Sequence, residues 1–344
     1  MNDNQFSSMK IFCHADKIAR YQAKETAFPV SVDLSPSNFC NHGCVWCVYS
    51  KFLEKSKEIL NKDVLLQLIA DLKTIGARGI NFTGGGEPLT NKFTVDAMEK
   101  AHDLGIDVGL ITNGALLNRD SIGRLKRICK YIRISLDAGA PGTYSRLHGV
   151  DMNEFKKVLS SIELLGKTDV TNECAVGVQL LQVAENRKET SSIVQRLKDF
   201  RIDFVEIRPA IDIDNTINEV TEINEADIDH LEGFGGEHFK VMVRHERFKM
   251  CSGYGKDYNK CISPHFIAAF GADGNVYTCC EFLGSKNYIL GNFVNESLED
   301  IFQFNRMEKK LGELNLSKCP KYCKTELINQ AFNRLCNIRH FNIL

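Results

Sequence analysis

Two periods of hydrophobic and polar positions alternate along residues 30–207, and together they predict repeated strand–helix units. Apolar residues recur every three or four positions in five segments, as in helices with one buried face: 62–76, 93–104, 121–129, 155–165 and 193–200. Short apolar runs around them predict six strands: 30–34, 79–83, 106–111, 131–136, 173–181 and 204–207. Such alternation indicates an α/β fold with a parallel sheet. Six units favour a partial (β/α)6 barrel over a closed eight-stranded one.

The segments that flank these units have a different composition. Residues 1–28 predict an N-terminal extension with one short helix over 15–24. The barrel is expected over 29–236, where the last part, 215–236, is an acidic connector typical of a solvated face. Residues 237–344 are rich in cysteine and predict a small C-terminal domain with helices over 297–311 and 325–339.

Charge and composition narrow the function classes. The formal net charge is −1, so bulk electrostatics does not indicate nucleic-acid or membrane binding. No apolar run approaches the roughly 18 residues of a membrane span. The N-terminus has neither the basic nor the apolar region of a signal peptide. Thirteen cysteines without such a signal favour the reducing cytoplasm, where they are metal ligands or free thiols.

Three of the cysteines lie within eight residues, directly after the first expected strand. Cys40, Cys44 and Cys47 have the spacing C-x3-C-x2-C, and a loop can wrap three such thiolates around one cluster. A [4Fe–4S] cluster normally takes four cysteines, so three would leave one iron open for a substrate or cofactor. Trp46, the only tryptophan, could contact a planar ligand. A zinc knuckle is the alternative, but zinc sites usually close at four ligands.

This motif resembles the cluster loop of radical S-adenosylmethionine (SAM) enzymes, including the aromatic residue before the last cysteine. The resemblance implies a [4Fe–4S] cluster whose open iron binds SAM. It also implies that one electron cleaves SAM to a 5′-deoxyadenosyl radical, which removes a hydrogen atom from the substrate. A flavodoxin- or ferredoxin-type reductant is the partner that such chemistry requires.

A glycine-rich turn follows the second expected strand. Gly84, Gly85, Gly86 and Glu87 resemble the GGE motif of the family, whose backbone holds the methionyl amino group. Glycines also suit close approach of a ligand to the backbone. Taken alone, Gly-Gly-Glu-Pro is more typical of a plain turn, and its place at a strand end after the cysteine loop favours the functional interpretation. Asn113, in Thr-Asn-Gly after the third strand, is a further candidate with the same alternative.

Polar residues at later strand ends complete the expected SAM pocket. Ser135 and Asp137 could bind ribose hydroxyls, and their segment looks like the fourth strand of the family. The run 144–149 resembles its Tyr-x-x-x-Arg-Gly pattern with the arginine one residue early, so Arg146 could pair with the methionyl carboxylate or lie on the surface. Gln179 is expected near the ribose and Arg208 near the adenine.

A second cysteine set lies in the C-terminal region. Cys261 and Cys279 frame a C-x12-G-x4-C pattern, and Cys319 and Cys323 add C-x3-C. This resembles the auxiliary-cluster region of the SPASM/Twitch group of radical SAM enzymes, and the short set fits a Twitch-like domain with one further [4Fe–4S] cluster. The C-x3-C spacing departs from the usual C-x2-C. Four thiolates also suit zinc, and three cysteines remain alternative ligands: Cys251, Cys280 and Cys336.

We expect the chain to be a radical SAM oxidoreductase or epimerase. A polar small molecule, such as a sugar, an aminocyclitol or a natural-product precursor, is the favoured substrate, because no peptide-recognition domain fits before Cys40. Peptide maturation with recognition in trans is the alternative, and a non-enzymatic iron–sulfur or zinc scaffold is a third class. Cys280 could donate hydrogen in an epimerisation, and His148 could orient the substrate.

Overall fold

One curved ten-stranded sheet organises the computed structural model, in the order β10-β9-β8-β1-β2-β3-β4-β5-β6-β7. The structure describes residues 7–170, 173–210, 226–251, 256–320 and 323–336. The strands are β1 (Ser31–Leu34), β2 (Gly79–Phe82), β3 (Asp107–Thr112), β4 (Cys129–Ser135), β5 (Ala175–Gln182), β6 (Phe204–Pro209), β7 (Lys240–Val243), β8 (Ile267–Phe270), β9 (Asn275–Tyr277) and β10 (Ile289–Asn292).

The order and direction of the strands confirm the expected α/β barrel. Strands β1 to β6 are the six expected strands, and each pairs in parallel with the next. Two strands that the sequence did not predict extend this parallel sheet: β7 pairs with β6, and β8 pairs with β1. Strands β9 and β10 add an antiparallel hairpin beyond β8. The barrel and the C-terminal region therefore share one sheet.

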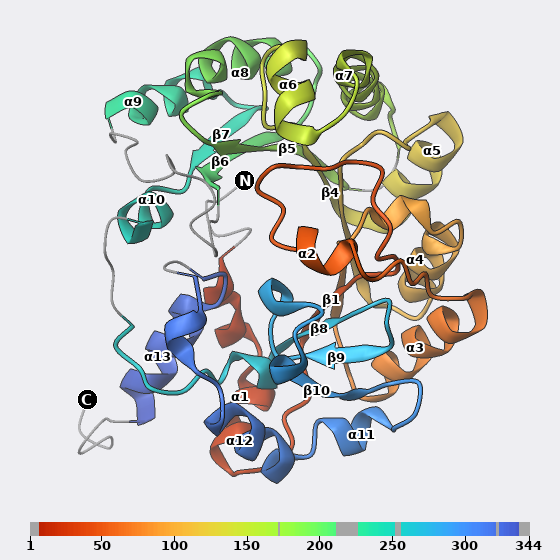
Figure 1. The fold of residues 1–344 in the computed structure, drawn as a ribbon, viewed down its shortest axis with the longest axis vertical. Helices are drawn as coiled ribbons and strands as arrows, with labels where there is room; N and C mark the ends of the chain where they lie inside the picture. Colours follow the sequence, from red (N-terminus) through yellow and green to blue (C-terminus); the bar gives the residue numbers. More distant parts are fainter. Residues whose placement is uncertain (1–6, 171–172, 211–225, 252–255, 321–322, 337–344) are drawn as a thin grey trace.

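Helices cover the outer side of the sheet, as Figure 1 shows for α3 to α9. Their bounds are α1 (Ala15–Gln22), α2 (Ser50–Leu53), α3 (Lys62–Thr74), α4 (Thr94–Asp103), α5 (Arg119–Ile128), α6 (Pro141–His148), α7 (Met152–Lys167), α8 (Thr190–Lys198), α9 (Ala226–Asp229), α10 (His245–Cys251), α11 (Leu298–Ile301), α12 (Phe304–Gly312) and α13 (Glu326–Cys336). Among these described helices, none combines the length and the apolar character that crossing a membrane requires.

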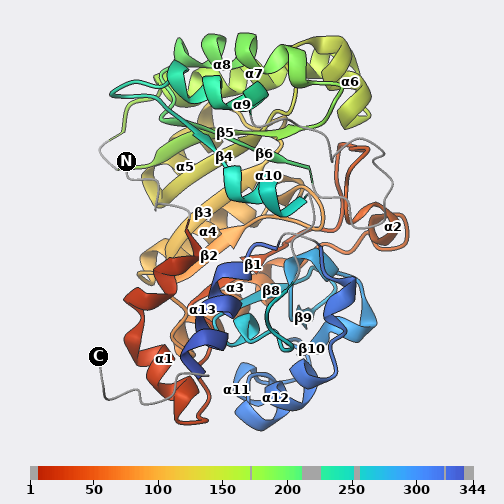
Figure 2. The ribbon, with the colours of Figure 1, turned by 90° about the vertical axis from the view of Figure 1, so that its left-hand side faces the viewer.

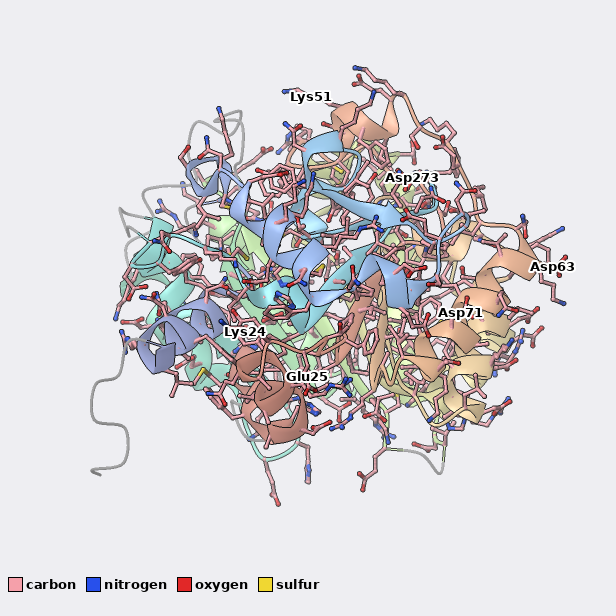
Figure 3. The ribbon with its side chains drawn as sticks, turned by 90° about the horizontal axis from the view of Figure 1, so that it is seen from below. Lys24, Glu25, Lys51, Asp63, Asp71 and Asp273 are labelled. Atoms are coloured by element: carbon pink, nitrogen blue, oxygen red, sulfur yellow. The ribbon has the colours of Figure 1, made fainter. Side chains whose placement is uncertain are left out.

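Helix α3 illustrates how the sequence pattern forms these elements. Asn61 accepts a hydrogen bond from the Val64 amide at 2.9 Å and caps the first turn. The apolar stripe of the helix is buried against the sheet: Leu65, Leu68, Ile69 and Leu72. Gly76, with φ of +78°, follows the last turn in the left-handed conformation that ends many helices. Figure 3 shows the charged Asp63 and Asp71 on the outer side of the molecule.

The predicted helix over 297–311 is wrong as a single element. The structure has two short helices there, α11 and α12, because the backbone turns at Phe302 and Gln303. This turn buries Phe302 beside Phe270, with ring centroids 6.3 Å apart. Burial of an aromatic ring thus outweighs the continuous helical pattern.

The N-terminal extension packs against the terminal helix. Ile11 lies in one apolar cluster with Phe266, Ile328 and Phe332. Figures 1 and 2 both show α1 beside α13. The two ends of the described chain therefore meet below the barrel, next to β8.

Replacing Leu72 with alanine should lower the free energy of unfolding by about 2–5 kcal/mol, because it leaves a cavity at a fully buried position. Leu116→Ala is the matched control, since Leu116 is 38% exposed, and its effect should stay within about 0.5 kcal/mol. Urea unfolding under anaerobic conditions measures both. Equal losses in the two variants would contradict the assigned burial.

Candidate active site

The cluster loop, residues 40–47, is held in place by the end of helix α6. The amides of Gly43 and Val45 donate hydrogen bonds to the carbonyls of His148 and Leu147, at 2.8 and 3.0 Å. Within the loop, the Cys47 amide donates to the Cys44 carbonyl at 3.1 Å. Cys40, Cys44 and Cys47 are free, half-buried thiols. Three thiols on one loop, none in a disulfide, fit the ligand set of a cluster with one open iron.

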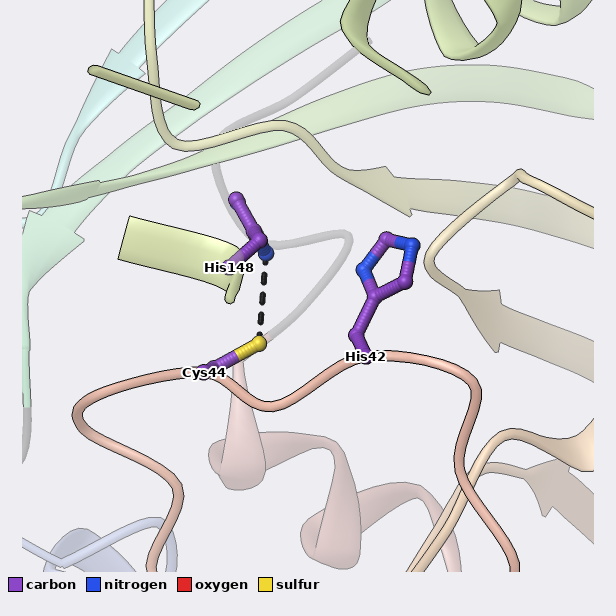
Figure 4. A group of neighbouring side chains, drawn as sticks. All are labelled: His42, Cys44 and His148. Atoms are coloured by element: carbon purple, nitrogen blue, oxygen red, sulfur yellow. Dashed lines mark hydrogen bonds between the residues drawn. The ribbon is translucent and has the colours of Figure 1, made fainter. Parts of the chain in front are cut away.

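His148 lies against this loop. Its Nδ1 is 3.2 Å from the Cys44 Sγ, and its Nε2 is 3.1 Å from the Leu136 carbonyl oxygen (Figure 4). Since Nε2 donates to that carbonyl, Nδ1 in a neutral ring is an acceptor. Burial, assisted by His42, lowers the pKa of His148 to about 3, so the ring is neutral. His148 therefore positions Cys44.

His42 approaches the same sulfur. One ligand atom from each of His42, Cys44 and His148 lies within 4.8 Å of the others, as Figure 4 shows. This set could hold a metal ion, but Cys44 is also part of the three-cysteine loop. Two imidazoles beside one thiol therefore form the immediate surroundings of a proposed cluster ligand.

The glycine turn, residues 84–87, is hydrogen-bonded to residues 37–39, the segment that leads to the cluster loop. The Gly86 amide donates to the Ser37 carbonyl at 3.0 Å, and the Glu87 amide donates to the Phe39 carbonyl at 3.0 Å. A Cβ atom on Gly86 would lie 2.3 Å from the Phe39 oxygen. Glycine is required there because the two backbones are in contact.

Glu87 connects the carboxyl ends of β2 and β3. Its Oε1 accepts from the Thr112 hydroxyl at 2.7 Å and from the Leu89 amide at 3.1 Å, and its Oε2 accepts from the Asn113 amide at 2.8 Å. Burial raises the pKa of Glu87, while these donors oppose the shift. The Asn113 side chain then donates to Asn41 Oδ1 at 2.8 Å. Glu87 and Asn113 thus join the strand ends to the cluster loop.

Ser135, at the end of β4, and Gln179, inside β5, are the residues expected near the ribose. Ser135 lies opposite Gln179 in the strand register. Gln179 is buried, and its Oε1 has no hydrogen-bond partner among the described residues. A buried orphan acceptor fits a ligand that brings a hydroxyl group. Asp137 instead turns toward β5, accepting from the Leu181 amide at 2.6 Å, and burial raises its pKa to about 7.

Three other candidates lie around this group. Trp46 packs with Leu147 and Val183, and its ring centroid is 5.8 Å from that of His148. Arg146 lies on the exposed side of α6, where its Nε is 2.6 Å from Glu185 Oε1, so the described conformation points it away from the glycine turn. Arg208 lies on the wall of the barrel cavity.

Electrostatic interactions link the four expected auxiliary ligands to one another. Burial raises the pKa of Cys323 to about 12, and Cys261 adds to the shift. Burial and Cys261 likewise raise the pKa of Cys319 to about 11. Cys279 is near enough to Cys280 and Cys323 for both to raise its pKa. Thiols that disfavour each other's ionisation at such range suit a metal cluster, because a bound cation removes the repulsion.

Hydrogen bonds support this second group. Thr325 joins the two halves: its hydroxyl donates to Ser263 Oγ at 2.9 Å, and it lies 3.5 Å from the Cys323 sulfur. Ser263 Oγ is 3.1 Å from the Cys261 sulfur. The side chains of the alternative ligands Cys251 and Cys336 lie outside the described residues.

A cavity of about 400 Å³ fills the inside of the barrel. Its wall holds Cys280 and Glu281 from the C-terminal region as well as residues from the strands. Several polar wall residues were missed by the sequence reasoning: Asp33, Asn81, Tyr131, Arg133, Glu206 and Lys324. The first five of these residues lie inside parallel strands of the sheet. Buried parallel strands are usually apolar on both faces, so a polar residue within such a strand was the sequence signal for a polar cavity wall.

Hydrogen bonds and ion pairs order this wall. Lys324 forms an ion pair with Asp33, and Asn81 Nδ2 donates to the same carboxylate at 2.9 Å. The Tyr131 hydroxyl donates to Asn81 Oδ1 at 2.8 Å. Burial alone would raise the pKa of Asp33, but Lys324 lowers it below its usual value. These contacts hold the polar and charged side chains on this part of the cavity wall in fixed positions.

Comparisons with known proteins agree with this geometry. Residues 34–197 match the family model of the radical SAM superfamily, and residues 261–325 match the SPASM iron–sulfur cluster-binding domain. This chain belongs to the radical SAM superfamily. The radical SAM domain binds SAM and a [4Fe–4S] cluster, and the SPASM domain binds auxiliary iron–sulfur clusters. The second match spans all four expected auxiliary ligands.

Named relatives include a PqqA peptide cyclase from Bradyrhizobium diazoefficiens, 26% identical over 55% of this chain and 48% of its own length. A cofactor-modifying protein for a tungsten-containing aldehyde ferredoxin oxidoreductase, from Pyrococcus furiosus, is 21% identical over 80% of this chain and 77% of its own length. This radical SAM chain spans about half the length of the PqqA peptide cyclase. Streptococcus suis SuiB bound to precursor peptide SuiA shares the fold, with a TM-score of 0.62, 15% identity, and coverage of 84% and 68% of the two chains.

These comparisons correct the expected substrate. The favoured small polar molecule is wrong, because a PqqA peptide cyclase is among the named relatives and a SuiB structure holds a precursor peptide. The expectation rested on the lack of an N-terminal recognition domain.

Replacing Gly149 with alanine should reduce SAM cleavage. Gly149 ends α6 with φ of +61°, and a Cβ there would lie 2.6 Å from the Gly43 oxygen in the cluster loop. We expect about a tenfold slower formation of 5′-deoxyadenosine, because small misplacements at a reacting site are costly. Gly142→Ala in the same helix is the control, since its Cβ would meet only Arg146 at 3.7 Å. Equal rates in both variants would contradict the packing.

Replacing Cys40, Cys44 and Cys47 together with alanine should abolish 5′-deoxyadenosine formation and leave roughly four irons per chain, the content of one [4Fe–4S] cluster. Iron analysis and product quantification after anaerobic reconstitution measure both. Cys13→Ala is the control, because Cys13 is an exposed thiol outside both groups. Zinc without iron in the triple variant would refute the proposed auxiliary ligands.

Proposed function

We propose that this chain is a radical SAM enzyme that removes a hydrogen atom from a peptide substrate. The observation that carries the proposal is the position of the cavity. Thr83 and Ile111 line it, and they directly precede the glycine turn and the Thr112–Asn113 corner. Cys280 also lines it and directly follows Cys279. A side chain in the cavity would therefore lie between the two proposed cluster sites.

The residues of this chain have distinct proposed roles. Cys40, Cys44 and Cys47 hold the first cluster, and Cys261, Cys279, Cys319 and Cys323 hold the second. When bound to the first cluster, SAM supplies a 5′-deoxyadenosyl radical. The proposed SAM pocket is formed by Trp46, Gly84, Gly85, Gly86, Ser135, Gln179 and Arg208, and Glu87 and Asn113 hold it against the cluster loop. Asp137, which accepts a hydrogen bond from the Leu181 amide, supports the end of β4 behind this pocket. The buried wall excludes water from a reactive intermediate.

We propose a net oxidation of the peptide. Abstraction of one hydrogen atom gives 5′-deoxyadenosine and a carbon radical on the peptide. Cys261, Cys279, Cys319 and Cys323 would hold an auxiliary cluster that could accept one electron from that radical. One proton would pass to a carboxylate on the wall, which leaves the peptide two hydrogens poorer. Glu281 lines the cavity next to Cys280 and is the proposed proton acceptor. An external one-electron reductant of the flavodoxin or ferredoxin class is required for SAM cleavage.

The relatives and the size of the cavity support a peptide as the substrate. The PqqA peptide cyclase matches this chain over 190 residues, 55% of its length. The P. furiosus relative extends over most of this chain and is named for modifying the cofactor of another enzyme. The cavity, about 400 Å³, is large enough for a side chain and part of its backbone, and small-molecule pockets begin near 300 Å³.

The test incubates the anaerobically reconstituted protein with SAM, dithionite and each short peptide encoded beside its gene, in deuterated water. We expect one peptide to become two hydrogens lighter, without solvent deuterium on carbon, as 5′-deoxyadenosine forms. Mass spectrometry of the peptide measures this. The triple cysteine variant is the control. SAM cleavage with no change in any peptide would refute peptide modification.

A peptide of unchanged oxidation level that carries one deuterium would instead indicate epimerisation. Cys280 is the thiol on the cavity wall, and its exchangeable hydrogen would carry the label. In that case Cys280→Ala should remove the deuterium and leave SAM cleavage intact. This result would overturn oxidation while keeping the peptide as substrate.

A further inference from the structure

The imidazole of His42, in the cluster loop, is buried without a hydrogen-bond partner. Neither of its two ring nitrogens is exposed, and neither has a partner among the described residues. The ring lies against those of His148 and Tyr144, with centroids 5.5 and 6.1 Å away. A buried polar group without a partner is costly. This imidazole is therefore suited to a ligand from outside the chain.

His148 presents a lone pair to the same place. Its Nε2 lies 3.1 Å from the Leu136 carbonyl oxygen, which can only accept, so Nε2 carries the proton and Nδ1 is the acceptor of the neutral ring. The Asp137 carboxylate, 3.6 Å from Nε2, favours the same tautomer. Nδ1 is 3.2 Å from the Cys44 sulfur. Metal-binding histidines have this arrangement, in which one nitrogen donates to a carbonyl and the other faces the metal.

Three potential metal ligands therefore converge on one point. One ligand atom from each of His42, Cys44 and His148 lies within 4.8 Å of the others (Figure 4). The ligand atoms of a tetrahedral zinc site are roughly 3.3–3.6 Å apart, as Zn–N and Zn–S lengths of about 2.0–2.1 and 2.3 Å require. His148 and Cys44 already lie close to this separation. An inward movement of His42 completes the set, and it breaks no hydrogen bond to its ring among the described residues.

Backbone hydrogen bonds join the two segments that carry these ligands. The amide of Gly43, which lies between two of them, donates to the His148 carbonyl at 2.8 Å. The Val45 amide donates to the Leu147 carbonyl at 3.0 Å. The loop and the end of α6 are thus fixed relative to each other before a metal binds, and this preorganisation lowers the entropic cost of binding.

We propose that His42, Cys44 and His148 form a Zn²⁺ site in the chain that lacks its first iron–sulfur cluster, and that zinc there prevents this cluster from assembling. Neutral imidazole and thiolate are ligands that zinc prefers, and three protein ligands leave its fourth position to water. The Cys44 thiol loses its proton to solvent as the Zn–S bond forms, and nothing is oxidised or reduced. Because Cys44 is also a proposed cluster ligand, the two metals exclude each other.

A zinc site made of the three loop cysteines is the competing arrangement. It would use Cys40 and Cys47, which the proposed site leaves out, and it would need neither histidine. The test therefore starts from the Cys40→Ser/Cys47→Ser double variant of the full chain, which keeps Cys44 and the four auxiliary cysteines. Anaerobic reconstitution with iron and sulfide comes first, so that the auxiliary cysteines are occupied when Zn²⁺ is added.

Zinc and iron are then measured per chain after unbound metal is removed. We expect the double variant to bind Zn²⁺, and we expect His42→Gln or His148→Gln, added to it, to weaken binding about 100-fold, because even groups behind a metal ligand contribute about 10–100-fold. His102→Gln is the matched control, since His102 lies exposed on α4 and should leave zinc binding unchanged. Iron content and the unfolding midpoint show whether each variant is folded. His42→Gln removes no hydrogen bond among the described residues, so it serves if His148→Gln does not fold.

The wild-type chain tests the competition with the cluster. Zn²⁺ added before reconstitution should lower both the iron content and the formation of 5′-deoxyadenosine, and His42→Gln should need about tenfold more zinc for the same loss of iron. Zinc binding that survives both histidine changes would overturn the proposal and assign the metal to cysteines. A double variant that binds no zinc, or equal zinc sensitivity of the wild-type and His42→Gln chains, would also overturn it. None of these outcomes depends on the peptide substrate.

Discussion

The geometry of the candidate site depends on one buried carboxylate, Glu87, at the junction of three segments. Its two oxygens accept hydrogen bonds from the corner after β3, and the adjacent backbone is bonded to the segment that leads to the cluster loop. A buried carboxylate without these donors would be strongly destabilising. The same bonds that stabilise the carboxylate therefore fix the glycine turn, Asn113 and the cysteine loop relative to one another.

Local patterns allowed the barrel strands and the cluster loop to be predicted. The strands are short apolar runs with turns at their ends, and the three loop cysteines lie within eight residues. The expected auxiliary cysteines are spread over residues 261–323, and only the resemblance to a known family grouped them. Strand β8 was missed because its pairing with β1 joins residues more than 200 positions apart, and no local pattern records such a contact. The bend at Phe302 was missed because ring packing, rather than propensity, decides it.

Side-chain direction was harder to predict than position. His148 and Arg146 lie on the same helix, yet the first contacts the cluster loop and the second pairs with Glu185 at the surface. Two residues on one helix separate in this way because helical positions two apart face different directions. The cavity charges show the same limit: Arg133 and Arg247 are distant in sequence, and only the barrel brings both near Glu206.

The parallel pairing of β8 with β1 has a consequence for dissecting the molecule. Four residues of the C-terminal region complete the hydrogen-bond ladder on one side of the strand that carries the cysteine loop. Without them, β1 would become an unpaired edge strand, which readily associates with other chains. The boundary between the two cofactor regions is thus not a place where the chain can be cut. Chains shortened to end before residue 267 would expose the edge of β1 and aggregate through it. This strand leads into the loop that carries Cys40, Cys44 and Cys47.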